Sequence, residues 1–237
     1  MRWKWARHPA RPFLFAEPFR NSKKCGNNGI VVSPDSLPLE AILLAGGRSR
    51  RMAGVNKLLL CVDGMAMVRR SALLYLDLGI SLTVVTGSDD GAVAAELAGL
   101  DVRLVANPNA ECGQHSSVRA GLVATPLTAP GLLVALADQP LLTTTDIRAL
   151  VAEFARHAGT RICVPRFAGD RGNPVIFPGS VARHLRDPGS MPPRAFIDAY
   201  PAQVAWFDAA NDHFTRDVDT PEDAADLIGA PSLLTRT

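Results

Sequence analysis

The sequence predicts an α/β fold with three layers, in which helices cover both faces of a mostly parallel sheet. Two observations carry this prediction. Short, continuous apolar runs recur along the chain, as expected of strands that are buried on both faces. Helical segments separate these runs with short loops, which is the order of repeated β-α-β units. The pattern is Rossmann-like, and 237 residues suffice for one domain with a full core.

The first elements alternate regularly. Residues 41–45 (AILLA) form a continuous apolar run ending at a glycine pair, which is typical of a buried parallel strand entering a loop. The next elements are expected as a helix over 66–78, a strand over 81–86, a helix over 89–97, a strand over 102–106, a helix over 116–124 and a strand over 131–137. Thr143-Thr144-Thr145-Asp146 then predicts the capped start of a helix that runs to about residue 157.

The second half of the chain is less regular. Short strands are expected over 161–165, 174–177 and 203–207. A closing helix is expected over 221–228, because Thr220 offers an N-cap hydroxyl and Pro221 suits the first turn. We expect residues 38–230 to form one domain and residues 231–237 a short tail.

The N-terminal 37 residues differ from the rest. They carry seven Lys or Arg against Glu17 and Asp35, which leaves a net charge of about −3 for the remainder of a chain with formal charge +2. They also lack the apolar segment and cleavage site of a secretory signal. We expect a disordered or loosely attached extension. The acidic remainder gives no reason to expect a nucleic acid partner.

Cysteine usage and hydropathy exclude further classes. The four cysteines Cys25, Cys61, Cys112 and Cys163 form no CxxC pair, and we interpret them as buried thiols in a reducing cytoplasm. No apolar run reaches the roughly 18–20 residues that cross a bilayer, so we expect no integral membrane protein.

The most informative segment follows the first predicted strand. From Leu44 to Lys57 the sequence reads LAGGRSRRMAGVNK. Its glycines expose backbone N–H groups, and its arginines and lysine supply positive charge, which together suit a triphosphate. It is neither a Walker A loop nor a GxGxxG fingerprint. We predict a phosphate-binding loop, with a solvated basic turn as the alternative.

Carboxylates follow strands at the same expected sheet edge. Asp138 ends the strand predicted over 131–137, where open α/β sheets bind ligands. A carboxylate there suits Mg²⁺, which prefers oxygen ligands and substrate phosphates. Asp217 and Asp219 are two residues apart on another expected strand, and we expect only one of them to point into the site. The alternatives are a capping role for Asp138 and a solvated turn for the pair.

These segments resemble the molybdenum cofactor nucleotidyltransferases, within a superfamily that includes sugar-phosphate and methylerythritol-phosphate nucleotidyltransferases. The resemblance covers roughly residues 40–229 and begins with LAGGxSxRM and NKLL. Further matches follow in order as Asn107-Pro108, Gly113–Leu122 (GQHSSVRAGL), Asp138-Gln139-Pro140, Gly172–Phe177 (GNPVIF) and Asp217–Asp223 (DVDTPED).

The resemblance implies a role for individual residues. Nucleotide binding is expected at Leu44, Ala45, Gly46, Gly47, Ser49, Asn107, Ser116 and Ser117. Ser116 and Ser117 are equally well explained as simple helix caps. The expected catalytic residues are Arg51, Lys57 and Asp138, the metal ligands Asp138 and Asp219, with Asp217 second to Asp219, and the acceptor-binding residues Asn173 and Arg194. No protein nucleophile is expected.

The implied reaction is Mg²⁺-dependent transfer of CMP from CTP to the phosphate of molybdopterin, which releases pyrophosphate. Gly47 favours the guanylyl branch, where LAGG is more typical, but the segments around Asn56, Ser116 and Asp138 look cytidylyl-like. We therefore expect CTP, with GTP as the alternative. An apo molybdenum hydroxylase would be the protein partner.

Two departures from the family pattern leave other functions open. Ala53 stands where the family usually has glycine, and residues 187–194 (DPGSMPPR) replace a common Gly-Asp-x-Gly-Ala-Arg stretch. A sugar or methylerythritol phosphate is therefore an alternative acceptor. A hypothesis of another class is a non-catalytic chaperone that delivers the cofactor to the hydroxylase, although the retained lysine and metal ligands favour catalysis.

Overall fold

A computed structural model describes residues 37–46, 52, 54–88 and 90–229, all within the contact unit that spans Val32–Thr237. The main sheet has the order β10-β7-β9-β6-β1-β4-β5, and β8 pairs with β7. Its strands are β1 (Leu39–Ala45), β4 (Ser81–Gly87), β5 (Val102–Asn107), β6 (Gly131–Leu136), β7 (Ile162–Phe167), β8 (Asp170–Arg171), β9 (Val175–Pro178) and β10 (Val204–Asp208). A separate hairpin pairs β2 (Cys61–Val62) with β3 (Met65–Ala66).

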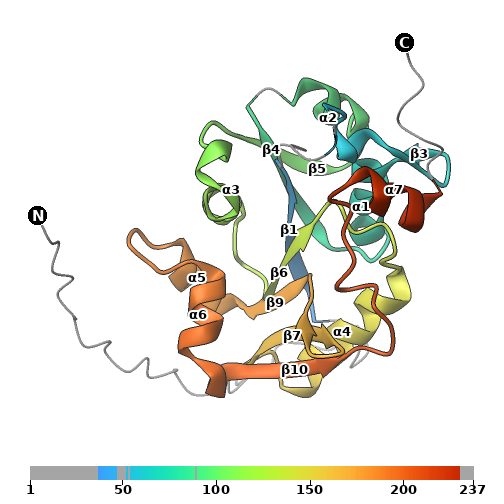
Figure 1. The fold of residues 1–237 in the computed structure, drawn as a ribbon. Helices are drawn as coiled ribbons and strands as arrows, with labels where there is room; N and C mark the ends of the chain where they lie inside the picture. Colours follow the sequence, from blue (N-terminus) through green and yellow to red (C-terminus); the bar gives the residue numbers. More distant parts are fainter. Residues whose placement is uncertain (1–36, 47–51, 53, 89, 230–237) are drawn as a thin grey trace, which may run out of the picture. The chain divides into compact units, whose positions relative to one another are not determined.

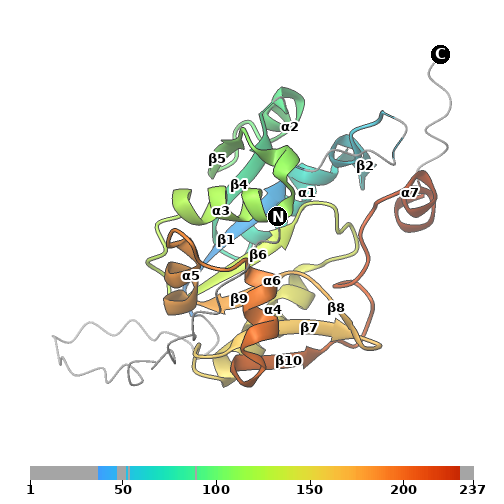
Figure 2. The same cartoon turned by 60° about the vertical axis from the view of Figure 1, so that its left-hand side comes forward.

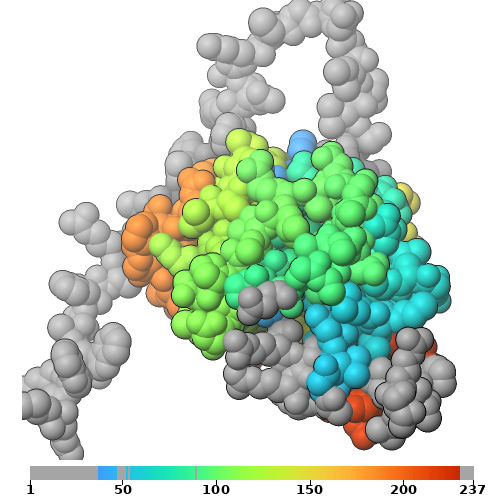
Figure 3. All heavy atoms as spheres, turned by 90° about the horizontal axis from the view of Figure 1, so that it is seen from above, coloured from blue at the N-terminus to red at the C-terminus, as the bar shows by residue number. Residues whose placement is uncertain are grey.

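Seven α-helices lie within the described residues. They are α1 (Met67–Leu76), α2 (Gly91–Glu96), α3 (Gln114–Ala124), α4 (Thr144–Arg156), α5 (Gly179–Arg186), α6 (Pro193–Ala199) and α7 (Pro221–Ile228). Figures 1 and 2 show α3, α5 and α6 on one side of the sheet and α1 and α4 on the other. Figure 3, seen from above, is dominated by residues of α2, β5 and α3, with β5 as the last strand of the sheet order.

The sheet is mostly parallel, as predicted. β1 pairs in parallel with both β4 and β6, β4 with β5, and β7 with β10. β9 is antiparallel to β6 and β7, and β8 is antiparallel to β7. The prediction of a three-layer α/β fold is therefore confirmed.

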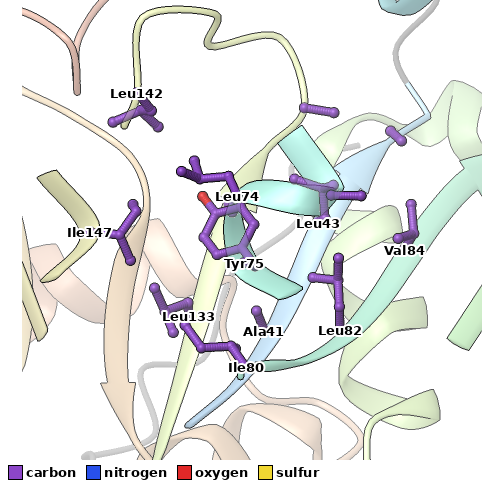
Figure 4. Packing of buried hydrophobic residues seen from close by; sticks show 14 of the residues in the cluster. Ala41, Leu43, Leu74, Tyr75, Ile80, Leu82, Val84, Leu133, Leu142 and Ile147 are labelled. Atoms are coloured by element: carbon purple, nitrogen blue, oxygen red, sulfur yellow. The ribbon is translucent and has the colours of Figure 1, made fainter. Parts of the chain in front are cut away.

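The central strands are buried on both faces. Along β1, Leu43 packs into the core beneath α1 and α4, whereas Ile42 and Leu44 pack into the core beneath α3 and α5. Figure 4 shows Leu43 and Tyr75 in the first of these cores, which places α1 against the sheet. This alternation explains why β1 is a continuous apolar run in the sequence.

The sequence missed part of the second half. The sequence predicted neither α5, α6 and β8 in the second half nor the β2–β3 hairpin in the first half. These elements are short, and α6 and the segment before it contain three prolines, so no sustained period marks them. The expected helix over 89–97 begins only at Gly91, because the Asp90 carboxylate accepts a hydrogen bond from Gly87 N at 2.8 Å instead of capping the helix.

The interpretation of the cysteines needs correction. Cys163 is buried, and burial raises the pKa of its thiol to about 12, but Cys61 and Cys112 are exposed. Cys61 begins a two-residue hairpin strand and Cys112 ends a surface turn, so neither side chain reaches a core. Cys25 lies outside the described residues, as do the expected extension up to residue 36 and the tail after 230.

Among the helices described, none combines the length and the apolar character that crossing a membrane requires.

The packing of α3 on the sheet gives a testable prediction. A Cβ at Gly121 would lie 2.5 Å from Ile42 Cγ2, whereas a Cβ at Gly91 would meet nothing within 4 Å. Gly121→Leu should therefore lower the free energy of unfolding by about 2 kcal/mol through overpacking. The control Gly91→Leu should change it by less than about 0.5 kcal/mol. Urea denaturation measures both, and equal effects of the two variants would contradict the packing argument.

Candidate active site

The carboxyl ends of the central parallel strands meet at one edge of the sheet. β1 ends there at Ala45, next to the end of β4, and a Cβ on the following Gly46 would lie 3.1 Å from Gly87 N. Leu44 and Ala45 are buried strand residues, so their side chains support the loop that follows. Of the predicted phosphate-binding loop, Gly47, Ser49 and Arg51 lie outside the described residues.

Lys57 returns to this edge after the loop. The Asn56 side chain accepts a hydrogen bond from Leu58 N at 3.1 Å and so caps the 3-10 turn Lys57–Leu59. The turn is supported from behind by a small core that contains Met52, Leu60, Val62, Met67, Val218 and Ala224. Because Val218 belongs to this core, the segments that carry Lys57 and Asp219 are held together by apolar packing.

The Lys57 ammonium lies between two carboxylates. Its Nζ is 2.5 Å from Asp138 Oδ2 and 2.8 Å from Asp219 Oδ1. Burial on its own lowers the pKa of Lys57, but the attraction and hydrogen bond of Asp138, followed by those of Asp219, leave the pKa above its ordinary value. Lys57 is therefore a fixed positive charge at neutral pH.

A third carboxylate completes the cluster. Asp138, Asp217 and Asp219 each offer a carboxylate oxygen, and these oxygens lie within 4.8 Å of one another. Burial, together with the negative charges of Asp138 and Asp219, raises the pKa of Asp217. The expectation that only one of Asp217 and Asp219 points into the site is wrong. The segment is not a sheet strand, and residues two apart in an extended chain point the same way.

The donor set fits a divalent cation. Oδ1 of Asp138 is buried and has no hydrogen-bond partner within the described part of the chain. A buried carboxylate oxygen without a partner is costly unless a cation or water satisfies it. Three carboxylates are also the hard oxygen ligands that Mg²⁺ prefers. The candidate ligands are thus Asp138 and Asp219, and Asp217 offers a third oxygen within 4.8 Å of theirs.

The last helix fixes the backbone at Asp219. Asp223 Oδ2 accepts hydrogen bonds from Asp219 N at 3.0 Å and from Thr220 N at 2.8 Å. Thr220 Oγ1 in turn accepts one from Asp223 N, so the two residues form the capping box of α7, with Pro221 in its first turn. The predicted helix start is confirmed, and the same cap orients the aspartate that precedes it.

Asn107 organises the start of α3. It ends β5, is buried, and donates from Nδ2 to Ser116 Oγ at 2.9 Å and Ser117 Oγ at 3.0 Å. Its Oδ1 accepts from Asn109 N at 3.0 Å. The structure therefore brings Asn107, Ser116 and Ser117 together, and Ser116 is half-buried. Their role in nucleotide binding stays a prediction.

A cavity of about 730 Å³ opens beside this edge. Its apolar wall comes from β6, β9, α3 and α6 and includes Val118, Leu136 and Phe177. Both residues predicted to bind the acceptor, Asn173 and Arg194, line it. Arg194 is exposed and makes no hydrogen bond or ion pair with the residues that the structure describes.

Two further arginines of the cavity were missed by sequence reasoning. Arg171 stacks on Trp206 at 5.2 Å from the ring centroid and pairs with Asp198 at 2.5 Å. Arg216 pairs with Asp226 at 2.6 Å. Arg171 directly precedes the GNPVIF motif and Arg216 directly precedes DVDTPED, so proximity to the motifs was the available signal. With Arg194, they place three arginines in the cavity lining, which also contains Asp170.

Solved structures that share the fold include nucleotidyltransferases. A nucleotidyl transferase from Methanothermobacter is 22% identical with a TM-score of 0.68, covering 82% of this chain and 97% of its own. Rv0371c from Mycobacterium tuberculosis, solved in complex with manganese, is 22% identical with a TM-score of 0.63, covering 82% and 100%. A CMP:2-keto-3-deoxy-manno-octonic acid synthetase complexed with CTP is 14% identical with a TM-score of 0.62, covering 81% and 97%.

The sequence itself matches a family. No curated protein matches the chain. The family model of the MobA-like NTP transferase domain matches residues 41–203, which is more than half of the chain. The chain therefore belongs to the MobA-like NTP transferases and is a nucleotidyltransferase.

The charge cluster predicts the effect of removing its cation. Lys57→Met should lower the free energy of unfolding by about 3 kcal/mol, because it leaves the Asp138 carboxylate largely buried without its partner. The double variant Lys57→Met/Asp138→Asn should recover part of this loss, since the uncompensated charge is gone. Urea unfolding in metal-free buffer measures both. A double variant that is less stable than Lys57→Met would contradict the assigned ion pair.

Proposed function

We propose that this MobA-like NTP transferase moves CMP from CTP to the phosphate of a molybdopterin-type acceptor, giving the cytosine dinucleotide form of the molybdenum cofactor. The observation that carries the proposal is the position of Lys57 among three carboxylates at the sheet edge, beside a large cavity whose lining includes Arg194 and two further arginines. One end of the site is thus suited to a metal-bound triphosphate and the other to an anionic acceptor.

In the proposed reaction, an oxygen of the acceptor's phosphate forms a bond to the α-phosphorus of CTP. The bond from that phosphorus to the bridging oxygen of the β-phosphate breaks, and pyrophosphate leaves. Lys57 and Arg51 would stabilise the negative charge on the phosphates, while the backbone of residues 44–47 and Ser49 would hold them. Asn107, Ser116 and Ser117 would contribute to the nucleotide site, with Asn107 acting through its hydrogen bonds to the two serines.

Asp138 and Asp219 would hold Mg²⁺, with Asp217 as a third available carboxylate. The cation supplies charge neutralisation on the α-phosphate and on the leaving pyrophosphate. The partnerless Oδ1 of Asp138 and the manganese complex of the mycobacterial neighbour support a divalent metal.

The choice of CTP rests on the cytidylyl-like segments and is supported by the neighbour that is complexed with CTP. GTP is the alternative because of Gly47. The choice of acceptor rests on the family resemblance and is supported by the cavity, because about 730 Å³ with both apolar residues and arginines in its lining suits a bulky molecule with an anionic end. An apo molybdenum hydroxylase in the cytoplasm would receive the product.

A pure carrier would have no use for the charge cluster. Three carboxylates close together cost stability through mutual repulsion, and a protein that only delivered a cofactor would gain nothing from keeping them. The retained cluster therefore favours catalysis over the chaperone hypothesis.

Pyrophosphate release tests the reaction. With Mg²⁺ and molybdenum-loaded molybdopterin, CTP should give acceptor-dependent release, whereas ATP and UTP should not; release with GTP would move the protein to the guanylyl branch. Asp138→Ala should reduce turnover at least 100-fold, as expected for loss of a preorganised electrostatic contact. Cofactor binding without release from any NTP would contradict the transferase and favour the chaperone.

The acceptor site is tested separately by Arg194→Ala. Loss of one charge-assisted hydrogen bond should raise KM for the acceptor about tenfold and leave KM for CTP unchanged. Arg148→Ala, which removes an exposed arginine from α4, is the matched control and should change neither constant. An equal rise in both KM values for Arg194→Ala would place Arg194 outside the acceptor site.

A further inference from the structure

One backbone carbonyl connects three parts of the proposed site. The carbonyl oxygen of Phe214 accepts a hydrogen bond from Gln139 Nε2 at 2.7 Å and another from Asn173 N at 2.9 Å. Gln139 directly follows Asp138, and Asn173 lines the cavity. Phe214 itself lies three residues before Asp217, in the segment between β10 and α7 that runs past α4 (Figure 1). Both lone pairs of the carbonyl are in use, so its position depends on both donors.

On the metal side, residues 138 and 139 hold the segment 214–218 at two points. Asp138 O accepts a hydrogen bond from Val218 N at 2.9 Å, and the Gln139 amide reaches Phe214 O. Gln139 is only 3% exposed and Phe214 only 2%, so water cannot readily replace this hydrogen bond. Two anchors four residues apart restrain the stretch that ends in Asp217 and Asp219.

On the cavity side, the Phe214 carbonyl lies close to the backbone of Gly172. A Cβ built on Gly172 would lie 2.5 Å from Phe214 O and 2.8 Å from its carbonyl carbon. These are backbone atoms that no side-chain rotation can move aside. Any residue larger than glycine at 172 must therefore displace the segment that carries Asp217 and Asp219, or itself move.

We propose that Gln139 is a positioning residue that couples the metal site to the acceptor cavity through the Phe214 carbonyl. The proposal rests on the proposed function, because it takes the aspartate cluster as the metal site. Three carboxylates repel one another, so the segment with Asp217 and Asp219 moves away from Asp138 unless it is anchored. Gln139 supplies one of the two anchors, and Gly172 sets where the anchored carbonyl lies relative to the cavity.

The test is the affinity for Mn²⁺ alone, measured by electron paramagnetic resonance of free Mn²⁺ on the full-length protein. Gln139→Met keeps the length of the side chain and removes the donor, and Gly172→Ala displaces the same carbonyl from the cavity side. Both variants should weaken Mn²⁺ binding about tenfold, as expected for residues that orient metal ligands without touching the metal. Neither residue belongs to the aspartate cluster itself.

Thr125→Val is the matched control for lost stability. It removes the buried hydrogen bonds that Thr125 Oγ1 makes with Thr83 Oγ1 and Gly121 O, at the end of α3 far from Ser116. This variant should bind Mn²⁺ as the wild type does, even where its urea midpoint falls as far as that of Gln139→Met. Steady-state kinetics give a second readout. In Gln139→Met, both the half-saturating concentration of Mg²⁺ and the KM for the acceptor should rise. A smaller folded fraction would instead lower only the apparent kcat.

The outcomes separate this inference from the proposed function. If the wild type binds Mn²⁺ and both Gln139→Met and Gly172→Ala bind it with the same affinity, the coupling is overturned and the metal site stands. Weaker binding in Thr125→Val to the same extent would also overturn it, because the effect would then follow stability alone. Absence of Mn²⁺ binding in the wild type would overturn the metal site and the coupling together.

Discussion

The structure of the site depends on a concentration of negative charge that a single buried ammonium offsets. At 4.8 Å, the upper limit of the separation of the carboxylate oxygens in the cluster, two unit negative charges repel by about 3.5 kcal/mol at an effective dielectric constant of 20, and the cluster contains three carboxylates. Lys57 contacts Asp138 and Asp219 directly, which are 81 and 162 residues away from it in sequence. The fold therefore has to bring three distant segments together against their mutual repulsion, and local sequence cannot do this alone.

Apolar packing on the side away from the carboxylates holds these segments together. Val218 stands between Asp217 and Asp219 and points the opposite way, into the core that also contains Met52 and Leu60. The Thr220–Asp223 capping box then fixes the chain where it leaves the site. Asp217 and Asp219 thus present two carboxylates on one side of the chain. The apolar packing of Val218 on the other side offsets the cost of desolvating them.

The fold was predictable because its central strands are buried on both faces and therefore appear in the sequence as continuous apolar runs. The site was predictable to the extent that each residue ends a predicted strand, as Asp138 does. What failed has separate causes. The expectation that only one of Asp217 and Asp219 points into the site overlooked that side chains two residues apart on an extended segment share a side. The prolines around α6 conceal a helix. Asn107 stays a predicted nucleotide-binding residue, and its hydrogen bonds to Ser116 and Ser117, which are nine and ten residues further along the chain, were not expected from the sequence.

The proposed site is divided between the two halves of the chain. Its proposed nucleotide end lies on the regular β-α units of the first half. The cavity is built largely from the irregular half, and residues 187–194 lead into α6. There Ser190 Oγ donates to Leu185 O at 2.6 Å and Arg119 donates to Arg186 O, which hold the altered loop against α5 and α3. The following Pro193 starts α6 and places Arg194 on the cavity wall. A change in this loop would therefore alter the proposed acceptor end of the site while leaving the aspartate cluster in place.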